Sequence, residues 1–433
     1  MKMSALTEWS DYMDFKLKNF GKIAEADIKL DGITVICGDN NTGKSTVGKA
    51  LFSFYNSLCD YKSKINMQKY SRFRNFVLAN VSNSMDLPIR IIDSDNPISF
   101  ISSQNGNFTI EQVKNYFEMN YPIKVTKEKI SSLVEYLNLP ENDILNEYVF
   151  RYFSLVMNNQ IKNLNSANRC SVSAKIRGNS INISLNKKSC SCTLPEPIEH
   201  SAYYINNPFV LDWLNVSNTS WFLAAMNPME RNVISAIVKA QADLNEDSMT
   251  NILESVINKK DLDEVRNVLK RAYSGDIIIN QGKYYYSENG LDFDVRNLSA
   301  GLKAFGLIER MLETGVLKRE DVLILDEPEI HLHSEWQIIY AELIVLLQKK
   351  FDLTVLIVTH SFHFLESLNF FMKKYDTSAK GNYYIPQKKN NGIIIQSYGN
   401  DTVELKKVLS TGSTTLSDLK FKYEMENYRE EDN

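Results

Sequence analysis

A glycine-rich octet near the start of this 433-residue chain combines backbone freedom with an ammonium and a hydroxyl group at fixed spacing. It follows the apolar run from Ile33 to Cys37, opens a helical pattern at Lys44, and fits G-x-x-x-x-G-K-[ST]. Glycines let backbone N–H groups surround phosphate oxygens, and a helix N-terminus adds positive potential. We expect Lys44 to reach the β and γ phosphates of a nucleotide and Ser45 to bind Mg²⁺. The predicted nucleotide contacts here are Gly38, Asn40, Asn41, Thr42, Gly43, Lys44, Ser45 and Thr46.

Two acidic residues, Asp326 and Glu327, end a run of four apolar residues in the C-terminal part of the chain. A buried strand delivers carboxylates to a site in this way. Asp326 is expected to orient the Mg²⁺ shell as a metal and nucleotide ligand, and Glu327 to polarise the attacking water as the catalytic base. Such a pair is often a solvated turn, but a nucleotide site also needs carboxylates for its metal and its water.

Histidines stand at two places near these acids. His360 ends the next apolar run, LTVLIVT, and is expected to contact the γ-phosphate as a catalytic residue. A lone histidine more often has a surface or core role, and only its place one strand beyond the acids favours the catalytic one. His331 and His333 are two residues apart, which is not the spacing of one helix face, so we expect them to pack in a loop.

A serine and a glycine, Ser299 and Gly301, precede an amphipathic helical pattern. Groups of this kind at a helix N-terminus suit phosphate binding and plain capping equally well. Ser299 stands 24 residues before Leu323 (323 − 299), in the run that ends in the acids, and this order of motifs favours a nucleotide contact for both residues.

Strand-like and helical patterns alternate along both ends of the chain, which predicts an α/β fold with a mixed sheet. Alternating apolar residues around Gly178-Asn179 predict a hairpin, and the region from Ile130 to Ile161 predicts amphipathic helix. The expected units are the N-terminal part of an ATPase head (1–60), an insertion of strands and helices (61–229), a short helical arm (230–275), the C-terminal part of the head (276–400), and a helix with an acidic tail (401–433).

Composition narrows the class of protein. The chain has 43% hydrophobic and 24% charged residues and a formal net charge of -4, so it has ample material for a core and no overall basic field. No apolar run reaches the roughly 18 residues of a membrane span, and we expect a cytoplasmic protein. The 5 cysteines suggest reduced thiols, with Cys190 and Cys192 as strand residues rather than metal ligands.

The motif set GDNNTGKS, LSAGLK, VLILDEPEIHLH and TH resembles the ABC-type ATPases of the SMC, RecF and OLD families. The resemblance covers about half of the chain, at both ends. It implies a P-loop ATPase head that binds ATP and Mg²⁺ between two copies, with Ser299 and Gly301 acting on the nucleotide held by the other copy. The opening LKNFGKIAEADIKL resembles the strands whose backbone flanks adenine in this group. Many such proteins, the ATPase of the Septu phage-defence pair among them, are encoded beside a nuclease or other toxic effector, so the resemblance implies such a partner here.

Several departures from the motifs of ABC-type ATPases exclude or disfavour particular members of that group. From Lys44 to Ser299 there are 255 residues (299 − 44), and the signature lacks a second glycine, so a transporter subunit is disfavoured. No CxxC is present for a zinc hook, and the 73 residues after His360 (433 − 360) leave little room for a nuclease domain. The glutamine that senses the nucleotide in ABC enzymes is placed at Gln104, with the loop near Asn206 as the alternative.

Three functions remain to be compared. The first is an ATP-gated regulator of a partner effector in bacterial antiphage defence. The second is a DNA repair or recombination ATPase, in which a basic run would contact phosphates, although such a run is more often a solvated face. The third is a scaffold that binds ATP without turnover, against which Glu327 and His360 argue. The basic run consists of Lys62, Lys64, Lys69, Arg72 and Arg74.

Overall fold

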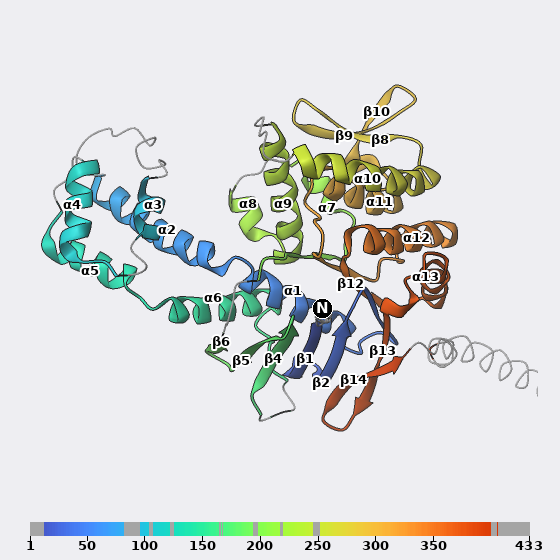
Figure 1. Ribbon diagram of the computed structural model, residues 1–433, viewed down its shortest axis with the longest axis horizontal. Helices are drawn as coiled ribbons and strands as arrows, with labels where there is room; N and C mark the ends of the chain where they lie inside the picture. Colours follow the sequence, from blue (N-terminus) through green and yellow to red (C-terminus); the bar gives the residue numbers. More distant parts are fainter. Residues whose placement is uncertain are drawn as a thin grey trace, which may run out of the picture.

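The protein consists of a head built on a large β-sheet and a helical lobe that projects from it (Figure 1). The computed structural model describes residues 13–81, 96–103, 107–121, 125–163, 166, 168–193, 198–216, 220–245, 252–399 and 405. In this part of the chain, no helix is both long and apolar enough to cross a membrane.

The large sheet has 11 strands in the order β6-β5-β4-β1-β2-β14-β13-β3-β12-β11-β7. Strands β7, β11, β12, β3 and β13 run parallel, whereas β1, β2, β4, β5 and β6 pair in antiparallel fashion, so the predicted mixed α/β sheet is confirmed. The strands are β1 (Met13–Phe20), β2 (Ile23–Leu30), β3 (Ile33–Cys37), β4 (Cys170–Ile176), β5 (Asn179–Leu185), β6 (Cys190–Thr193), β7 (Ala202–Ile205), β11 (Val322–Asp326), β12 (Thr354–Thr359), β13 (Gly381–Lys389) and β14 (Gly392–Gly399).

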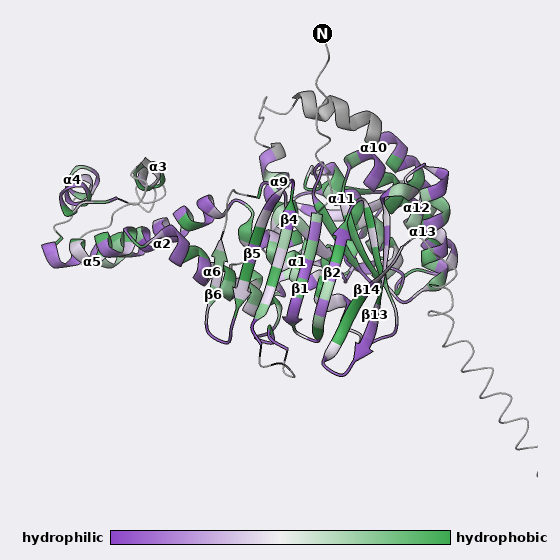
Figure 2. Ribbon diagram, turned by 60° about the horizontal axis from the view of Figure 1, so that its bottom comes forward, coloured by the Kyte–Doolittle hydropathy of each residue, from purple (hydrophilic) through white to green (hydrophobic). Residues whose placement is uncertain are grey.

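The central parallel strands are buried on both faces. Figure 2 shows hydrophobic residues also along β14 of the same sheet. Along β11, Leu323 and Leu325 join one hydrophobic core, while Val322 and Ile324 join the core on the opposite face. Parallel strands that helices cover on both sides require such continuous apolar sequences. The apolar run that predicted this strand from the sequence therefore contributes to two hydrophobic layers, one on each face of the sheet.

Helices cover the two faces of the sheet. On one face α1 (Lys44–Leu58) packs with α6 (Glu141–Val156). The opposite layer contains α9 (Pro228–Asn245), α10 (Ile252–Ala272), α11 (Ala300–Glu313), α12 (Ser334–Phe351) and α13 (Phe362–Lys374), with the short α7 (Val210–Trp213) and α8 (Ser220–Ala225). Beside them lies a small antiparallel sheet of β8 (Asp276–Asn280), β9 (Lys283–Glu288) and β10 (Leu291–Asp294).

The lobe has a small core of its own. It comprises α2 (Tyr61–Val81), α3 (Asn96–Ser103), α4 (Ile110–Asn120) and α5 (Lys127–Leu137). Aromatic residues dominate this core, and the rings of Phe73 and Phe117 stack with centroids 5.1 Å apart. Figure 1 shows the lobe extending from the side of the head where α1 and α6 lie.

The unit boundaries expected for the middle of the chain need correction. Residues 61–229 are not one insertion, because β4 pairs with β1 and β7 pairs with β11 inside the large sheet. The described residues between 230 and 275 do form helices, but α9 and α10 do not project as an arm, because they bury apolar residues such as Ile237 and Leu269 in the head. Helical periodicity identifies an apolar face and leaves its docking site undetermined.

Two local boundaries also differ. The hairpin turn lies at Arg177 and Gly178, whose φ angles are 46° and 83°, one residue before the predicted dipeptide. The helical region from Ile130 to Ile161 divides around Pro140, which precedes the first residue of α6. The C-terminal helix and tail lie outside the described residues, apart from Leu405.

A buried acid on α11 couples the stability of the head to pH. Glu309 is 3% exposed and accepts a hydrogen bond from the Tyr273 hydroxyl at 2.8 Å. Burial raises the pKa of its carboxyl from 4.5 to about 7, the charges of Glu313 and Asp276 add to the rise, and Lys270 opposes it. Between these pKa values the folded chain keeps a proton that the unfolded chain releases, so the free energy of unfolding falls as pH rises through this window.

Replacing Glu309 by Gln should remove this pH dependence while an amide oxygen still accepts the bond from Tyr273. We expect the free energy of unfolding of E309Q to match that of the wild type near pH 5 and to exceed it by about 3 kcal/mol near pH 8. This difference follows from about 1.4 kcal/mol per unit of pKa shift. Urea denaturation at both pH values measures the difference. If the wild type and E309Q lose the same stability between pH 5 and pH 8, Glu309 is not the group that causes the pH dependence.

Candidate active site

The loop between β3 and α1, residues 38–45, is here called the P loop. Three of its residues have left-handed backbone conformations, with φ angles of 155° at Gly38, 63° at Asn41 and 76° at Gly43. The positive φ of Gly43 favours glycine there, whereas a Cβ atom would lie 2.8 Å from Cδ1 of Ile23, the end of a side chain that can move aside. The loop therefore adopts the tight turn that the octet predicts, and α1 begins at Lys44.

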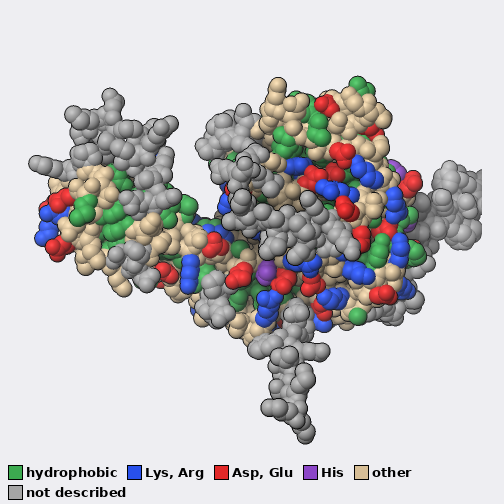
Figure 3. All heavy atoms as spheres, turned by 45° about the horizontal axis from the view of Figure 1, so that its top comes forward, with side chains coloured by type: hydrophobic (Ala, Val, Ile, Leu, Met, Phe, Trp, Pro, Cys, Tyr) green, Lys and Arg blue, Asp and Glu red, His purple; other side chains and the backbone are tan. Residues whose placement is uncertain are grey.

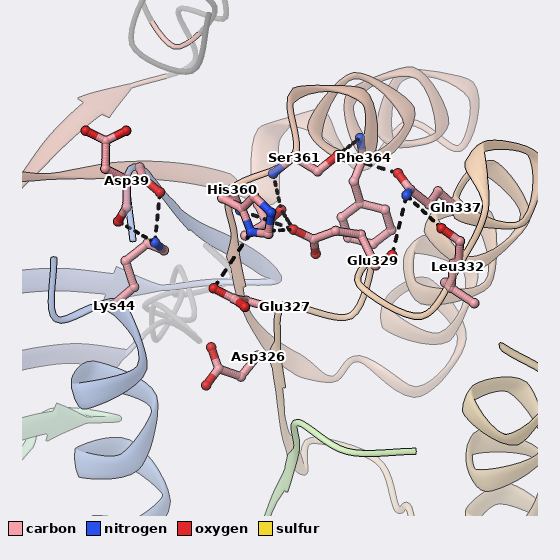
Figure 4. A network of polar contacts seen from close by, with 12 residues as sticks. Asp39, Lys44, Asp326, Glu327, Glu329, Leu332, Gln337, His360, Ser361 and Phe364 are labelled. Atoms are coloured by element: carbon pink, nitrogen blue, oxygen red, sulfur yellow. Dashed lines mark hydrogen bonds and ion pairs between the residues drawn. The ribbon is translucent and has the colours of Figure 1, made fainter. Parts of the chain in front are cut away.

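Lys44 lies across the P loop rather than pointing into solvent (Figure 4). Its Nζ donates hydrogen bonds to the carbonyl oxygens of Gly38 and Asp39, each at 2.8 Å. Burial lowers the pKa of this ammonium, and the nearby carboxylates of Glu327 and Asp326 oppose that effect. The side chain is thus held beside the P-loop backbone, and its contact with the β and γ phosphates stays a prediction.

Asp326 brings three elements together at the end of β11. The Ser45 hydroxyl donates to its Oδ1 at 3.0 Å, and the Tyr204 hydroxyl donates to its Oδ2. Tyr204 is on β7, which pairs in parallel with β11 and places Ile205 beside Leu325. Burial raises the pKa of the Asp326 carboxyl, while the bonds from Tyr204 and Ser45 lower it. A hydroxyl and a carboxylate thus meet where the two predicted Mg²⁺ ligands should lie.

Tyr204 was not among the residues predicted from the sequence. Its side chain is 2% exposed, and its ring lies against α1, where a Cβ on Gly48 would be 3.0 Å from the ring. The strand Ala202–Ile205 looks like ordinary core in the sequence, because a tyrosine in a buried strand usually serves packing. Only the pairing of β7 with β11 reveals that its hydroxyl belongs to the site.

Glu327, Glu329 and His360 form a second group beside the first (Figure 4). His360 Nδ1 lies 3.7 Å from Oε1 of Glu327 and 3.4 Å from Oε1 of Glu329. Glu327 has φ 55°, an uncommon angle for a residue other than glycine, and its N–H donates to the Val358 carbonyl at 2.7 Å. Strained backbone of this kind is found preferentially at functional sites. Glu327 and His360 lie together as predicted, whereas Glu329 was overlooked.

A small hollow beside these acids is lined by the loop after β7. Asn206 and Asn207 line it together with Asp326 and Glu327. Gln104, the residue we expected to sense the nucleotide, lies outside the described residues. The loop near Asn206, the alternative to Gln104, lies beside Asp326 and Glu327.

The donor set fits a nucleotide with its magnesium ion. Backbone N–H groups at a helix start and a lysine ammonium suit phosphate oxygens, and a serine hydroxyl beside an aspartate suits a hard divalent cation. Lys44, Ser45 and Asp326 would hold these groups. When bound, Mg²⁺ would neutralise charge on the phosphates, and Glu327 is placed to hold a water molecule beside them.

Ser299 and Gly301 lie away from these contacts. The exposed Ser299 caps α11, where its Oγ accepts a hydrogen bond from the Leu302 N–H at 3.3 Å. A Cβ on the buried Gly301 would be 2.8 Å from the Trp336 ring and 3.2 Å from the His331 carbonyl oxygen. Close helix packing within the chain is therefore a sufficient reason for this glycine.

The other two histidines and the two cysteines considered in the sequence analysis have packing environments. The His331 ring meets Phe209 edge-on with centroids 5.9 Å apart, and His333 lies 5.1 Å from Trp336. Cys190 and Cys192 are on β6, where burial raises the pKa of their thiols to about 12 and about 11.

The basic run on α2 is largely engaged within the protein. Lys64 Nζ donates to the carbonyl oxygens of Cys59 and, at 2.8 Å, Asn56. Lys69 is 2% exposed, and the Arg72 guanidinium lies over the Tyr136 ring at 5.4 Å. On the face seen in Figure 3, positive and negative side chains are interspersed over the head.

Replacing Tyr204 by Phe should weaken the response to Mg²⁺, because Asp326 loses the donor that orients its carboxylate. We expect the Mg²⁺ concentration for half-maximal nucleotide hydrolysis to rise about 10- to 100-fold, with ATP affinity in EDTA unchanged. Titrating the ATPase activity with Mg²⁺ measures the metal requirement, and calorimetry in the absence of metal measures the affinity for ATP. An unchanged Mg²⁺ requirement would reduce Tyr204 to a packing residue.

Among solved structures, heads of SMC proteins are similar to the chain. The SMC head domain from Thermotoga maritima is 11% identical, with 89% of this chain and 97% of that chain covered and a TM-score of 0.38. The Smc head domain with an extended coiled coil bound to the C-terminal domain of ScpA, derived from Pyrococcus furiosus, is 10% identical, with 92% and 98% covered and a TM-score of 0.40. No curated protein sequence matches the chain.

A family model described as an AAA ATPase domain matches residues 13–365. The matched segment begins at β1 and ends within α13, so it contains the P loop, the β11 carboxylates and His360. It covers well over half of the 433 residues. The chain therefore belongs to the AAA ATPase domain family.

Proposed function

We propose that this protein hydrolyses ATP in a site completed by a second copy of the chain, and that ATP-dependent pairing regulates a separate effector protein. One observation carries the ATPase part. The P loop, the hydrogen-bonded Ser45 and Asp326, and the group of Glu327 and His360 converge on one edge of the sheet. These are the groups that phosphoryl transfer to water requires.

Each group has a role that follows from its position. Lys44 counters phosphate charge beside the P-loop backbone, and Ser45 with Asp326 holds Mg²⁺. Glu327 is the base for the attacking water, because its carboxylate stands at the end of β11, beside β12, the strand that ends at His360 and pairs with the P-loop strand β3. His360 is 43% exposed and can face the γ-phosphate from the neighbouring strand.

The proposal of a shared site has a physical basis in the openness of this edge. A triphosphate on a single P loop would leave its γ-phosphate exposed to water, which weakens stabilisation of the developing charge. Ser299 and the N–H of Gly301 begin a 14-residue helix whose N-terminus is solvent-exposed at Ser299. Placed over the nucleotide of another copy, it would supply donors and exclude water, and two-fold symmetry would make two such sites.

Exposed apolar residues near Ser299 support pairing through this face. Phe209 and Ile330 are 39% and 55% exposed, and Phe209 contacts His331, whose carbonyl oxygen lies close to Gly301. Large apolar side chains at the surface are typical of protein contacts when they cluster. A second copy that presents the same surface would bury them.

The regulatory role in bacterial antiphage defence, with a nuclease-like effector, is supported by the resemblance of the motif set to defence ATPases. Fold-level analogy of this kind identifies a class of function and leaves the trigger undefined. The DNA-repair alternative has less support, because Lys64, Lys69 and Arg72 of the basic run are occupied within the protein.

Replacing Glu327 by Gln should preserve ATP binding and stop turnover. The amide keeps the shape of the side chain but cannot accept the proton of the attacking water, so we expect kcat to fall about 10²- to 10⁴-fold. The variant should also accumulate as an ATP-held dimer, visible by light scattering. Glu366→Gln, the same change at an exposed position of α13, is the matched control. Wild-type turnover by E327Q would exclude Glu327 as the base.

Replacing Ser299 by Arg should leave ATP binding by the monomer within about twofold and abolish ATP-dependent dimerisation and turnover. Ser299→Thr, which keeps the capping hydroxyl, controls for loss of the cap. Lys44→Ala alone should not bind ATP. Mixing Lys44→Ala with Ser299→Arg should restore part of the activity, because both lesions fall in one of the two sites. A monomer of Ser299→Arg with lowered ATP affinity would show that Ser299 acts within its own chain.

A further inference from the structure

Glu329 is a buried carboxylate beside the proposed catalytic group. It is 4% exposed, and its Oε1 accepts hydrogen bonds from the Thr359 hydroxyl at 2.6 Å and the His360 backbone N–H at 3.1 Å. The His360 ring nitrogen Nδ1 lies 3.4 Å from the same oxygen. A single oxygen of Glu329 therefore lies beside the backbone N–H of His360, its ring, and the hydroxyl of Thr359.

This arrangement fixes which edge of the imidazole faces the site. Nδ1 lies near the carboxylates of Glu329 and Glu327, at 3.4 and 3.7 Å, so it is the nitrogen that should carry the proton. The ring then presents Nε2 on its opposite side, and the side chain of His360 as a whole is 43% exposed. A bound γ-phosphate would meet a ring whose orientation and tautomer are already set.

The segment that carries Glu329 is itself fixed in place. Gln337 Nε2 donates to the carbonyl oxygens of Leu332 at 2.9 Å and Glu329 at 3.4 Å, and its Oε1 lies 3.5 Å from the Ser361 hydroxyl, a polar contact at the limit of hydrogen bonding. Ser361 also caps α13 by accepting a bond from the Phe364 N–H at 3.2 Å. Loop and strand end are thus bonded to each other on both sides of His360 (Figure 4).

The other carboxylate oxygen of Glu329 favours a functional role for this residue over a purely structural one. Its Oε2 is buried and has no hydrogen-bond partner among the residues described. A buried oxygen without a partner is costly, and a carboxylate in such a place is poorly chosen if its purpose is only to stabilise the fold. Glutamine would keep the acceptor for Thr359 and the His360 N–H without the charge.

We propose that Glu329 is a positioning residue for the ATPase reaction, acting only through His360 by fixing the orientation and tautomer of its ring. The inference rests on the proposed hydrolysis of ATP. Glu329 does not touch the nucleotide, and its carboxylate, rather than any acceptor of that shape, is the required group.

A double-mutant cycle tests this directly. Steady-state ATP hydrolysis is measured for the wild type, Glu329→Gln, His360→Ala and the double variant, with Glu366→Gln as the control for an exposed position. We expect Glu329→Gln to lower kcat about 10- to 100-fold, with KM for ATP within about threefold. In the His360→Ala background the same change should alter kcat by less than about twofold. Independent losses that multiply, or full activity of Glu329→Gln, would overturn the proposal.

A second measurement keeps the test independent of turnover. Nitrogen NMR of ¹⁵N-histidine-labelled protein, with the His360 signals assigned by their loss in His360→Ala, reports which ring nitrogen carries the proton. We expect protonated Nδ1 in the wild type and a tautomer mixture in Glu329→Gln, with melting temperatures that agree within about 3 °C. If the wild type fails to hydrolyse ATP but shows this difference, the proposed function fails, whereas the fixing of the His360 tautomer by Glu329 stands. Identical tautomers in both proteins would overturn the positioning role.

Discussion

The parallel pairing of β11 with its two neighbours is the constraint on which the site depends. Carboxyl ends of parallel strands meet at one edge of a sheet, so β7, β11 and β12 deliver Tyr204, Asp326 and the residues around His360 to the same place. β3 continues this edge beyond β12 and leads into the P loop. No single motif creates the site, because residues more than 300 positions apart become neighbours only when these strands pair in register.

That pairing is maintained from both faces of the sheet. Alternate residues of β11 and β12 enter different hydrophobic cores, so a slip of one residue would exchange the two sets and turn every site residue away. Helix α1 adds a further restraint, because Gly48 allows the Tyr204 ring to approach closely. The hydrogen bond from Tyr204 to Asp326 is thus a consequence of how helix and sheet pack.

Residues with a chemical reason for their spacing could be found in the sequence. The P loop, Asp326, Glu327 and His360 follow from a glycine pattern and from apolar runs that end in polar groups, and the start of α1 at Lys44 follows from helical periodicity. Tyr204 and Glu329 could not be found in this way. In the sequence Tyr204 looks like a core residue and Glu329 like an additional acid after a turn. Their roles depend on hydrogen-bond partners that are 122 and 31 residues away, respectively. For the same reason, the middle of the chain was assigned to an insertion although its strands belong to the sheet.

The attachment of the lobe has a mechanical consequence. The lobe begins at Tyr61, directly after α1, and returns to the head at α6, which packs against α1. Lys64 binds the carbonyl oxygens of Asn56 and Cys59, so the first turn of the lobe is fastened to the end of the helix that starts at Lys44. The lobe is therefore attached to the head along α1, the helix that starts at Lys44. A force on the far end of the lobe would reach the P loop through α2, the short break at Cys59 and Asp60, and then α1.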